Sequence, residues 1–299
     1  MSLILRNGIA CFRATRLLMH LGYGLLLAVA YPGFGLKYRQ RILQRWSAGL
    51  LSVLNIRVTF VAKGEIQDGH SGLIVSNHIS WLDVFVLNSV IPMRFVAKSE
   101  VRQWPVIGWL CARAQTLFIE RGKVRSAARI NASMAELLQQ GESLAVFPEG
   151  TTTDGTQLAH FHSSLLQPAI DANVPLHPIA IRYQNAGGER SQTASYIDDV
   201  SLGESLWRIL CAAQLEVRLL LTPALDVRNV DRRELARQAH QQIDTALEAM
   251  QLSAALPARQ YEPMQSTHKR AGAEPHFQSL YCVLLYTTLA YKQQHRAGE

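Results

Sequence analysis

The sequence of 299 residues predicts an α/β fold: a mixed, largely parallel sheet of about seven strands covered by helices, with an N-terminal membrane-associated helical segment. Short apolar segments alternate with helical patterns from about residue 55 to residue 252, as expected for strands linked by helices. Two of these segments, LAVF and LHPIAI, are mainly apolar runs, which is typical of strands buried on both faces. The N-terminal prediction rests on residues 17–36, which contain no Asp, Glu, Lys or Arg.

The predicted elements divide the chain into three regions. The candidate strands are residues 56–62, 73–76, 94–97, 116–119, 144–147, 176–182 and 215–221. Helical patterns lie near residues 81–91, 100–113, 124–140, 161–172, 204–212 and 231–249. We therefore expect a membrane-associated helical region (1–54), an α/β domain (55–255), and a polar linker followed by an apolar C-terminal helix (256–299).

The uncharged N-terminal run is about as long as a bilayer's hydrocarbon core is thick. Pro32 predicts that its helix ends near Tyr31, so the run is a short span, a re-entrant arm or an interfacial helix. A cleaved signal peptide is the alternative, because basic residues precede an apolar core and residues 28–30 (AVA) resemble a cleavage site. Residues 39–53 mix basic and apolar residues at helical spacing and predict a second surface helix.

The positive charge is concentrated at the N-terminus. The first 50 residues carry seven Lys or Arg and no Asp or Glu, whereas the remaining 249 carry 23 basic and 23 acidic residues. Basic residues near an anionic membrane contribute about 1 kcal/mol each to binding, so we expect membrane lipids as partners. Nucleic acid is not expected, because no basic stripe continues into the body. The four cysteines lack C-x-x-C spacing, which predicts reduced thiols in a cytoplasmic protein.

The strongest indication of chemistry is the segment SNHISWLD, from Ser76 to Asp83, directly after a predicted strand. Histidine commonly takes up a proton near neutral pH, and a carboxylate bonded to its second ring nitrogen fixes its tautomer. Within one continuous helix, side chains five residues apart would point about 140° away from each other. We therefore expect His78 in a loop, Ser80 as the N-cap of a helix, and Asp83 in the first helical turn. From spacing alone, Asp83 as a simple cap and His78 as an ordinary turn residue remain the alternative.

Three later segments complete a candidate site. Residues 117–121 (LFIER) form a strand ending in Arg121, whose planar donors suit a phosphate, although a surface ion pair is the simpler interpretation. A buried strand then breaks into FPEGT, residues 147–151, a turn that exposes backbone N–H groups where α/β sheets bind ligands, although an ordinary tight turn explains this segment equally well. Residues 174–180 (VPLHPIA) form a strand with proline at its entrance, for which a scaffold role is simpler.

These four segments resemble the sequence blocks of the lysophospholipid acyltransferase family, the glycerolipid acyltransferases that include bacterial 1-acylglycerol-3-phosphate acyltransferase. They occur in the family's order across about residues 70–182. The matching residues are Asn77, His78 and Asp83 in the first block, Phe118, Ile119 and Arg121 in the second, Phe147 to Thr151 in the third, and Val174, Pro175 and Pro178 in the fourth.

The resemblance implies acyl transfer from acyl-CoA or acyl-carrier protein to 1-acylglycerol-3-phosphate, forming phosphatidic acid. It also implies an active site facing the cytoplasm at the inner membrane, no cofactor, no metal and no covalent enzyme intermediate. His78 would remove the acceptor's hydroxyl proton, and Asp83 would hold the imidazole. The implied substrate-binding residues are Asn77, Ser80, Trp81, Phe118, Arg121, Glu149, Gly150 and Thr151.

The chain departs from the family pattern at two places. Gln115 stands where the second block usually has glycine, and residues 161–164 (FHSS) stand where many relatives have a lysine-containing segment. The second departure bears on head-group recognition, so lyso-ornithine lipid or another lysolipid is the alternative acceptor.

Other classes of protein explain the sequence less well. A non-catalytic membrane-binding protein would leave the four blocks unexplained. A serine hydrolase would need a G-x-S-x-G nucleophile elbow, which does not occur. A metal hydrolase using His160, His162 and His177 lacks a recognised ligand pattern.

Overall fold

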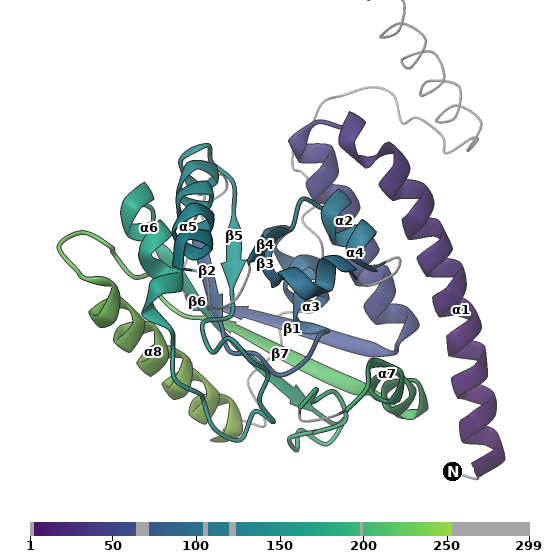
Figure 1. Cartoon of the computed structure of the whole chain (residues 1–299). Helices are drawn as coiled ribbons and strands as arrows, with labels where there is room; N and C mark the ends of the chain where they lie inside the picture. The colour runs from purple at the N-terminus through teal and green to yellow at the C-terminus, as the bar shows by residue number, and fades with distance from the viewer. Residues whose placement is uncertain (1–2, 64–71, 104–106, 120–123, 198–199, 253–299) are drawn as a thin grey trace, which may run out of the picture. The chain divides into compact units, whose positions relative to one another are not determined.

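The structure, a computed structural model, describes residues 3–63, 72–103, 107–119, 124–197 and 200–252 (Figure 1). All of these residues belong to one compact unit, Met1–Tyr261. The expected linker and C-terminal helix (256–299) and Arg121 lie outside the described residues.

Seven strands form one sheet in the order β1-β7-β6-β2-β5-β3-β4. Every neighbouring pair is parallel except β6 and β7, which are antiparallel, so the expected mixed and largely parallel sheet is confirmed. The strands are β1 Ile56–Ala62, β2 Leu73–Ser76, β3 Arg94–Lys98, β4 Leu117–Ile119, β5 Leu144–Val146, β6 Leu176–Gln184 and β7 Leu215–Leu221.

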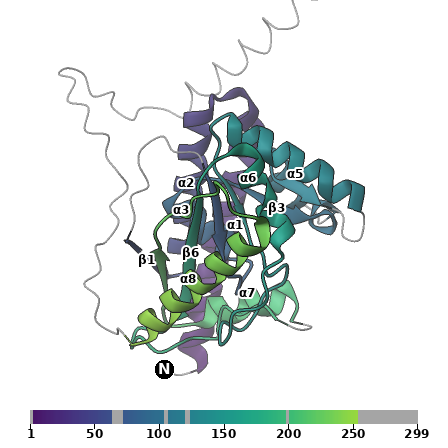
Figure 2. The same cartoon turned by 90° about the vertical axis from the view of Figure 1, so that its left-hand side faces the viewer.

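Helices cover both faces of the sheet, with α1–α4 and α7 on one side and α5, α6 and α8 on the other (Figures 1 and 2). The α-helices are α1 Leu3–Ala30, α2 Leu36–Val53, α3 Asp83–Val90, α4 Ile107–Arg113, α5 Val124–Gln139, α6 Gln167–Ala172, α7 Leu202–Cys211 and α8 Arg232–Leu252. The 3₁₀ turns are η1 Tyr31–Gly33, η2 Ser99–Gln103 and η3 Ser163–Leu166.

β2 and β5 are almost entirely apolar because both of their faces are buried. On β2, Ile74 packs toward α2 and α3, whereas Leu73 and Val75 pack toward α5 and α8. Successive residues of a strand point to opposite faces, so a strand covered on both sides has no polar alternation. The carboxyl ends of β2 and β5 lie side by side in this arrangement and bring the turns after them together.

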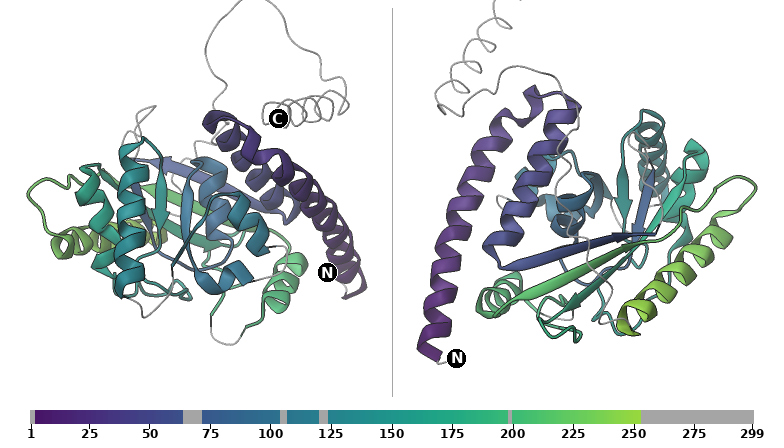
Figure 3. Two further views of the ribbon diagram at one scale, coloured as in Figure 1. Left: turned by 45° about the horizontal axis from the view of Figure 1, so that its top comes forward. Right: turned by 180° about the vertical axis from the view of Figure 1, so that it is seen from behind.

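The N-terminal helices pack against the body. α1 ends at Ala30 before the turn that contains Pro32, as expected. The guanidinium group of Arg13 donates to the carbonyl oxygens of Leu210, Ala212 and Ala213 at the end of α7, where the helix exposes unpaired carbonyls. Figure 3 shows α1 running beside α2.

The expectation of a surface helix over residues 39–53 is wrong for the second half of α2. Ser47, Leu50, Leu51 and Val53 are buried, and the apolar ones belong to the core that covers one face of the sheet. The mixed composition of α2 therefore reflects a helix with one buried face rather than one that lies free on a surface.

Candidate active site

The turn between β2 and α3 brings His78 and Asp83 together. His78 lies in the turn and Asp83 is the first residue of α3, as expected from their spacing. The His78 Nδ1 atom lies 2.8 Å from Asp83 Oδ2. The His78 side chain is 20% exposed and that of Asp83 is fully buried, so a substrate can reach the imidazole but not the carboxylate.

The expected N-cap is corrected by the structure. The N-cap of α3 is Leu82, and Ser80 Oγ accepts a hydrogen bond from the Leu82 N–H at 3.3 Å instead of capping a later residue. The Asp83 carboxylate nevertheless reaches back to the Ser80 N–H at 2.9 Å, as in half of a capping box. Asp83 therefore shapes the turn as well as contacting the histidine.

Both oxygens of Asp83 accept hydrogen bonds. Oδ2 accepts from the Ile79 N–H at 2.7 Å as well as from Ser80 and His78, and Oδ1 accepts from the Tyr183 hydroxyl at 2.7 Å. Burial and the nearby Asp83 raise the pKa of Tyr183 well above its ordinary value, so the phenol stays neutral and donates. Because an ionised carboxylate only accepts, the proton in the short contact belongs to His78 Nδ1. This tautomer leaves His78 Nε2 free to accept a proton.

A second carboxylate fixes the backbone of His78. Glu149, in the turn after β5, accepts the His78 N–H on Oε1 at 2.7 Å and the Ala159 N–H on Oε2 at 2.9 Å. Burial raises the pKa of Glu149, and its hydrogen bonds with Ala159 and His78 oppose that rise. The Thr153 N–H also donates to the His78 carbonyl oxygen at 2.8 Å, so the turn after β5 holds His78 at both its N–H and its carbonyl.

The imidazole of His78 stacks on Phe147, with ring centroids 4.0 Å apart and planes 7° apart. Phe147 in turn stacks on Phe95 at 5.9 Å. An aromatic face on one side and a carboxylate at Nδ1 hold the ring in one orientation.

Three of the expected substrate-binding residues also brace this turn. The Asn77 side chain exchanges hydrogen bonds with the backbone of Ile181 at 3.0 and 2.8 Å, which joins the end of β2 to β6. Ser80 is fully buried, and Trp81 Nε1 donates to Ser205 Oγ on α7 at 3.1 Å. Contact of these three side chains with substrate remains a prediction.

The other expected residues lie in separate places. Phe118 is on β4 beneath the guanidinium group of Arg102, whose carbon is 5.7 Å from the ring centroid. Gly150 takes a left-handed backbone at φ 68°, and Thr151 is exposed in the turn after β5. Gln115, the departure from glycine, also takes a left-handed backbone at φ 61°, a conformation that glycine adopts more readily.

Sequence reasoning missed Tyr183 and the stacking role of Phe147. The predicted strand stopped at residue 182, whereas β6 continues to Gln184. Tyr183 follows Ile179 and Ile181 at alternate positions, so all three side chains belong to the same core. A prediction that β6 pairs with β2 and continues past residue 182 would have placed Tyr183 beside the histidine turn.

The three histidines of the metal alternative do not form a ligand set. The His160 and His162 rings lie 5.9 Å apart, and His177 is buried on β6. Among the residues that the structure describes, no group of three or more His, Cys, Asp or Glu side chains is placed to hold a metal ion.

Comparison with known proteins identifies the family. The Acyltransferase family model matches residues 57–182. A lyso-ornithine lipid O-acyltransferase of Pseudomonas aeruginosa is 39% identical over 242 residues, covering 79% of this chain and 92% of the relative. A 1-acyl-sn-glycerol-3-phosphate acyltransferase of Neisseria meningitidis is 36% identical over 181 residues, covering 60% and 70%.

A solved structure shares the fold. The crystal structure of the 1-acyl-sn-glycerophosphate acyltransferase PlsC from Thermotoga maritima matches with a TM-score of 0.55 at 20% identity, covering 82% of this chain and 99% of that one. Together with the sequence relatives, this places the chain in the lysophospholipid acyltransferase family, as an acyltransferase that acts on a lysolipid.

Proposed function

We propose that the chain transfers a fatty acyl group from acyl-CoA or acyl-carrier protein to the free hydroxyl of a lysolipid, with His78 as the general base. The observation that carries this proposal is the 2.8 Å contact between His78 Nδ1 and the buried Asp83 carboxylate, which leaves Nε2 as a proton acceptor. A base positioned in this way contributes a factor of about 10²–10⁴ to the rate.

The proposed acyl transfer uses the two substrates and this dyad. The acceptor hydroxyl gives its proton to His78 Nε2 as its oxygen attacks the thioester carbonyl carbon. The tetrahedral intermediate then expels the thiolate, which takes the proton from the imidazolium, so an ester and a free thiol are formed. Asp83 stabilises the imidazolium, since a carboxylate beside a cation favours its charged form.

The acceptor that we favour is lyso-ornithine lipid. The alignment with the lyso-ornithine lipid O-acyltransferase of Pseudomonas aeruginosa covers 79% of this chain and 92% of the relative, whereas the alignment with the Neisseria meningitidis enzyme covers 60% and 70%. From Phe147 to Ile181, a stretch that includes the turn packed on His78, the sequence has no Lys or Arg to meet a phosphate. The acceptor expected from the sequence, 1-acylglycerol-3-phosphate, is the second candidate, supported by the Neisseria meningitidis relative and by the position of Arg121 in the sequence.

The membrane contact that we propose is the outer face of α1. α1 is the one described helix long and apolar enough to cross a membrane. One face of it packs on the body through Ala10, Leu17 and Ala28, and the His20 ring stacks on Trp46 of α2 at 5.0 Å. The opposite face exposes Phe12, Leu18, Met19, Tyr23, Leu26 and Val29.

This division favours a helix lying in the surface of one leaflet, which we place on the cytoplasmic side of the inner membrane. If α1 crossed the membrane, it would lose its contacts with the rest of the protein. Cleavage after Ala30 would expose the core residues that α1 covers. Release of the full-length protein from membranes by a salt wash alone would contradict this insertion. Leu18→Asp with Leu26→Asp should weaken binding to anionic vesicles, whereas Leu252→Asp, also at an exposed leucine, should not.

The test of the activity is an acyl-transfer assay with the purified protein. Lyso-ornithine lipid, 1-acylglycerol-3-phosphate and lysophosphatidylethanolamine are each offered with acyl-CoA and with acyl-carrier protein, and the products are identified by mass spectrometry. We expect diacylated product from lyso-ornithine lipid with the highest kcat/KM. Higher kcat/KM for 1-acylglycerol-3-phosphate would select the second acceptor, and no transfer to any lysolipid would overturn the proposal.

A further inference from the structure

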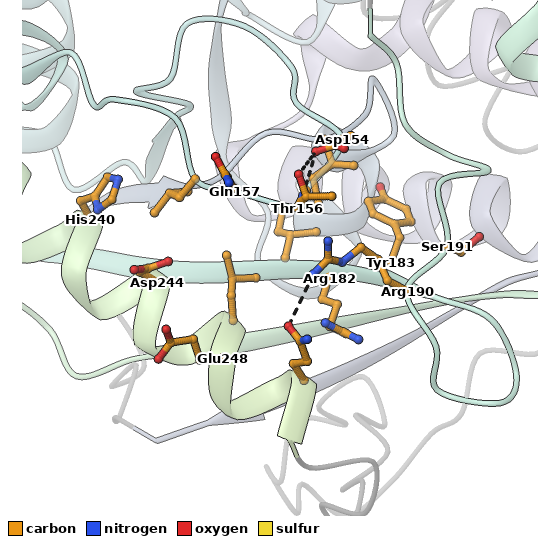
Figure 4. Close-up of a pocket in the computed structure, with 16 residues that line it drawn as sticks. Asp154, Thr156, Gln157, Arg182, Tyr183, Arg190, Ser191, His240, Asp244 and Glu248 are labelled. Atoms are coloured by element: carbon orange, nitrogen blue, oxygen red, sulfur yellow. Dashed lines mark hydrogen bonds between the residues drawn. The ribbon is translucent and has the colours of Figure 1, made fainter.

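A cavity of about 400 Å³ lies between β6, α8 and the loop of residues 154–158 (Figure 4). It borders the catalytic turn without containing His78. Ile79 and Tyr183, which both donate hydrogen bonds to Asp83, line its wall. Gly155 packs closely against Ile79 in the wall of the cavity, since a Cβ at that glycine would lie 2.9 Å from Ile79 Cδ1. A molecule held in this cavity would therefore lie against the turn that carries the dyad.

The buried end of the cavity carries two arginines. Arg182, on β6, is 8% exposed, and its buried Nε has no hydrogen-bond partner in the structure. Arg190 lines the same cavity, and its long contact with Gln251 at 3.5 Å is its single side-chain hydrogen bond among the described residues (Figure 4). Burial lowers the pKa of Arg182, and the positive charges of Arg190 and Arg218 lower it further.

A desolvated guanidinium surrounded by like charge is costly unless an anion accompanies it. Buried polar nitrogens nearly always have a partner, so the unpaired Nε leaves the Arg182 guanidinium group incompletely satisfied. Because Arg182 also lines the cavity, an anion held there would contact the same guanidinium group. The planar donors of arginine match a carboxylate or a phosphate.

The rim of the cavity carries the opposite charge. Asp244 and Glu248 lie one turn apart on α8, at i and i+4, so both face the cavity from the same side of the helix (Figure 4). Both residues are exposed, and neither side chain makes a hydrogen bond or an ion pair with another residue in the part of the chain that the structure describes. The third carboxylate of the lining, Asp154, is bonded to Thr156, which lowers its pKa, and lies close enough to Arg190 for that cation to lower its pKa further, so it does not belong to the α8 rim.

We propose that this cavity binds the zwitterionic amino-acid head group of the lipid acceptor, with its carboxylate at Arg182 and Arg190 and its ammonium group at Asp244 and Glu248. This inference rests on the proposed function and specifies the acceptor. An ornithine whose α-amino group is acylated keeps one carboxylate and one ammonium group, separated by the α-carbon and three methylene groups, so a single head group carries both of the charges that the two ends of the cavity would bind. A phosphate monoester would satisfy the arginines but would face the rim carboxylates, which repel it.

The test compares the two charged ends of the cavity in the full-length protein. Arg190→Gln and the pair Asp244→Asn with Glu248→Gln are assayed for KM and kcat with lyso-ornithine lipid and with 1-acylglycerol-3-phosphate. Arg182→Gln is added with a thermal-unfolding control, because this side chain is buried. Arg228→Gln is the matched control, since Arg228 is exposed, pairs with Asp226 and does not line the cavity.

We expect KM for lyso-ornithine lipid to rise about tenfold in Arg190→Gln and in the acidic pair, with kcat nearly unchanged, and no change in Arg228→Gln. In the acidic pair, KM for 1-acylglycerol-3-phosphate should stay the same or fall. If the arginine variant raises KM for 1-acylglycerol-3-phosphate instead, the cavity is a phosphate site and the proposal is wrong. Unchanged KM values for both lipids would also overturn it.

Direct binding separates this proposal from the proposed activity. Binding of lyso-ornithine lipid in mixed micelles is measured by isothermal titration calorimetry for the wild type and Arg190→Gln. If binding depends on Arg190 but the protein transfers no acyl group, the head-group site is supported and the proposed acyl transfer is rejected. Transfer to lyso-ornithine lipid with binding that does not depend on Arg190 would support the activity and reject the cavity.

Discussion

The turn that carries His78 and the cavity beneath α8 differ in how their charged groups are partnered. In the turn, both oxygens of Asp83 and both oxygens of Glu149 accept hydrogen bonds from the protein. In the cavity, the buried Nε of Arg182 has no partner, and the carboxylates at the rim make no ion pair within the described part of the chain.

This difference separates preorganisation from binding. A turn whose polar groups are satisfied before substrate arrives needs no reorganisation during the reaction, which is how positioned groups accelerate chemistry. A cavity whose charges lack partners is completed by its ligand. Changes in the turn should therefore lower kcat, whereas changes in the cavity should raise KM.

Among the substitutions at residues that hold His78 in place, Asp83→Asn should lower kcat the most. Asparagine keeps the shape of the side chain but removes the negative charge that stabilises the imidazolium, so kcat should fall about 10²–10⁴-fold. Steady-state assays with acyl-CoA measure this, and thermal unfolding checks the fold. A folded variant with kcat within about threefold of the wild type would show that the contact has no catalytic role.

Glu149→Gln should have an intermediate effect. A glutamine amide has one acceptor oxygen, so either the His78 or the Ala159 N–H loses its partner, and kcat should fall about tenfold because His78 is less well held. A glutamine that left kcat unchanged would mean that the Glu149–His78 bond is not needed to position the histidine.

Glu149→Gln also tests a pH dependence of stability. Burial raises the pKa of Glu149, so the folded state binds its proton more tightly than the unfolded state does. Its contribution to the free energy of unfolding therefore rises as pH falls through the raised pKa, and is lost as pH rises. The urea midpoint of the wild type relative to Glu149→Gln should increase from pH 7 to pH 4.5. A difference that decreases on acidification would mean that the pKa is lowered.

Tyr183→Phe should have the smallest effect on rate. It removes the donor to Asp83 Oδ1 and leaves a buried carboxylate oxygen with one fewer partner, which should cost about 1.5–3 kcal/mol of stability. We expect kcat to fall only severalfold, because Oδ2 keeps its contact with His78. Urea unfolding and kcat measured on the same preparation test both parts, and a loss of kcat as large as that in Asp83→Asn would contradict this order.

The sequence allowed the sheet and the dyad to be predicted for physical reasons. β2 and β5, which are buried on both faces, were short and almost entirely apolar runs, and the spacing of His78 and Asp83 was compatible with a loop followed by a first helical turn. The predicted capping residue was wrong because α3 starts at Asp83, two residues later than expected, and Ser80 instead accepts the Leu82 N–H in the turn before the helix.

Long-range partners could not be predicted from sequence. Tyr183 and Glu149 reach the turn because β6 and β5 flank β2, and that strand order is a property of the fold rather than of any local pattern. The cavity was missed for the same reason, since Arg182 and Glu248 are far apart in sequence and line one cavity only because α8 packs across β6 (Figure 4). α2 was expected at a surface because its many basic residues suggested a helix exposed on a membrane surface, although one of its faces is buried in the protein.

Acyl transfer by His78→Ala tests the central claim most directly. Purified wild type and variant are compared with lyso-ornithine lipid and acyl-CoA, following both the free thiol and the diacylated product, with thermal unfolding and vesicle binding as controls. We expect a folded, membrane-bound variant whose kcat is lower by at least about 10²-fold. Turnover close to that of the wild type would contradict the assignment of His78 as the base.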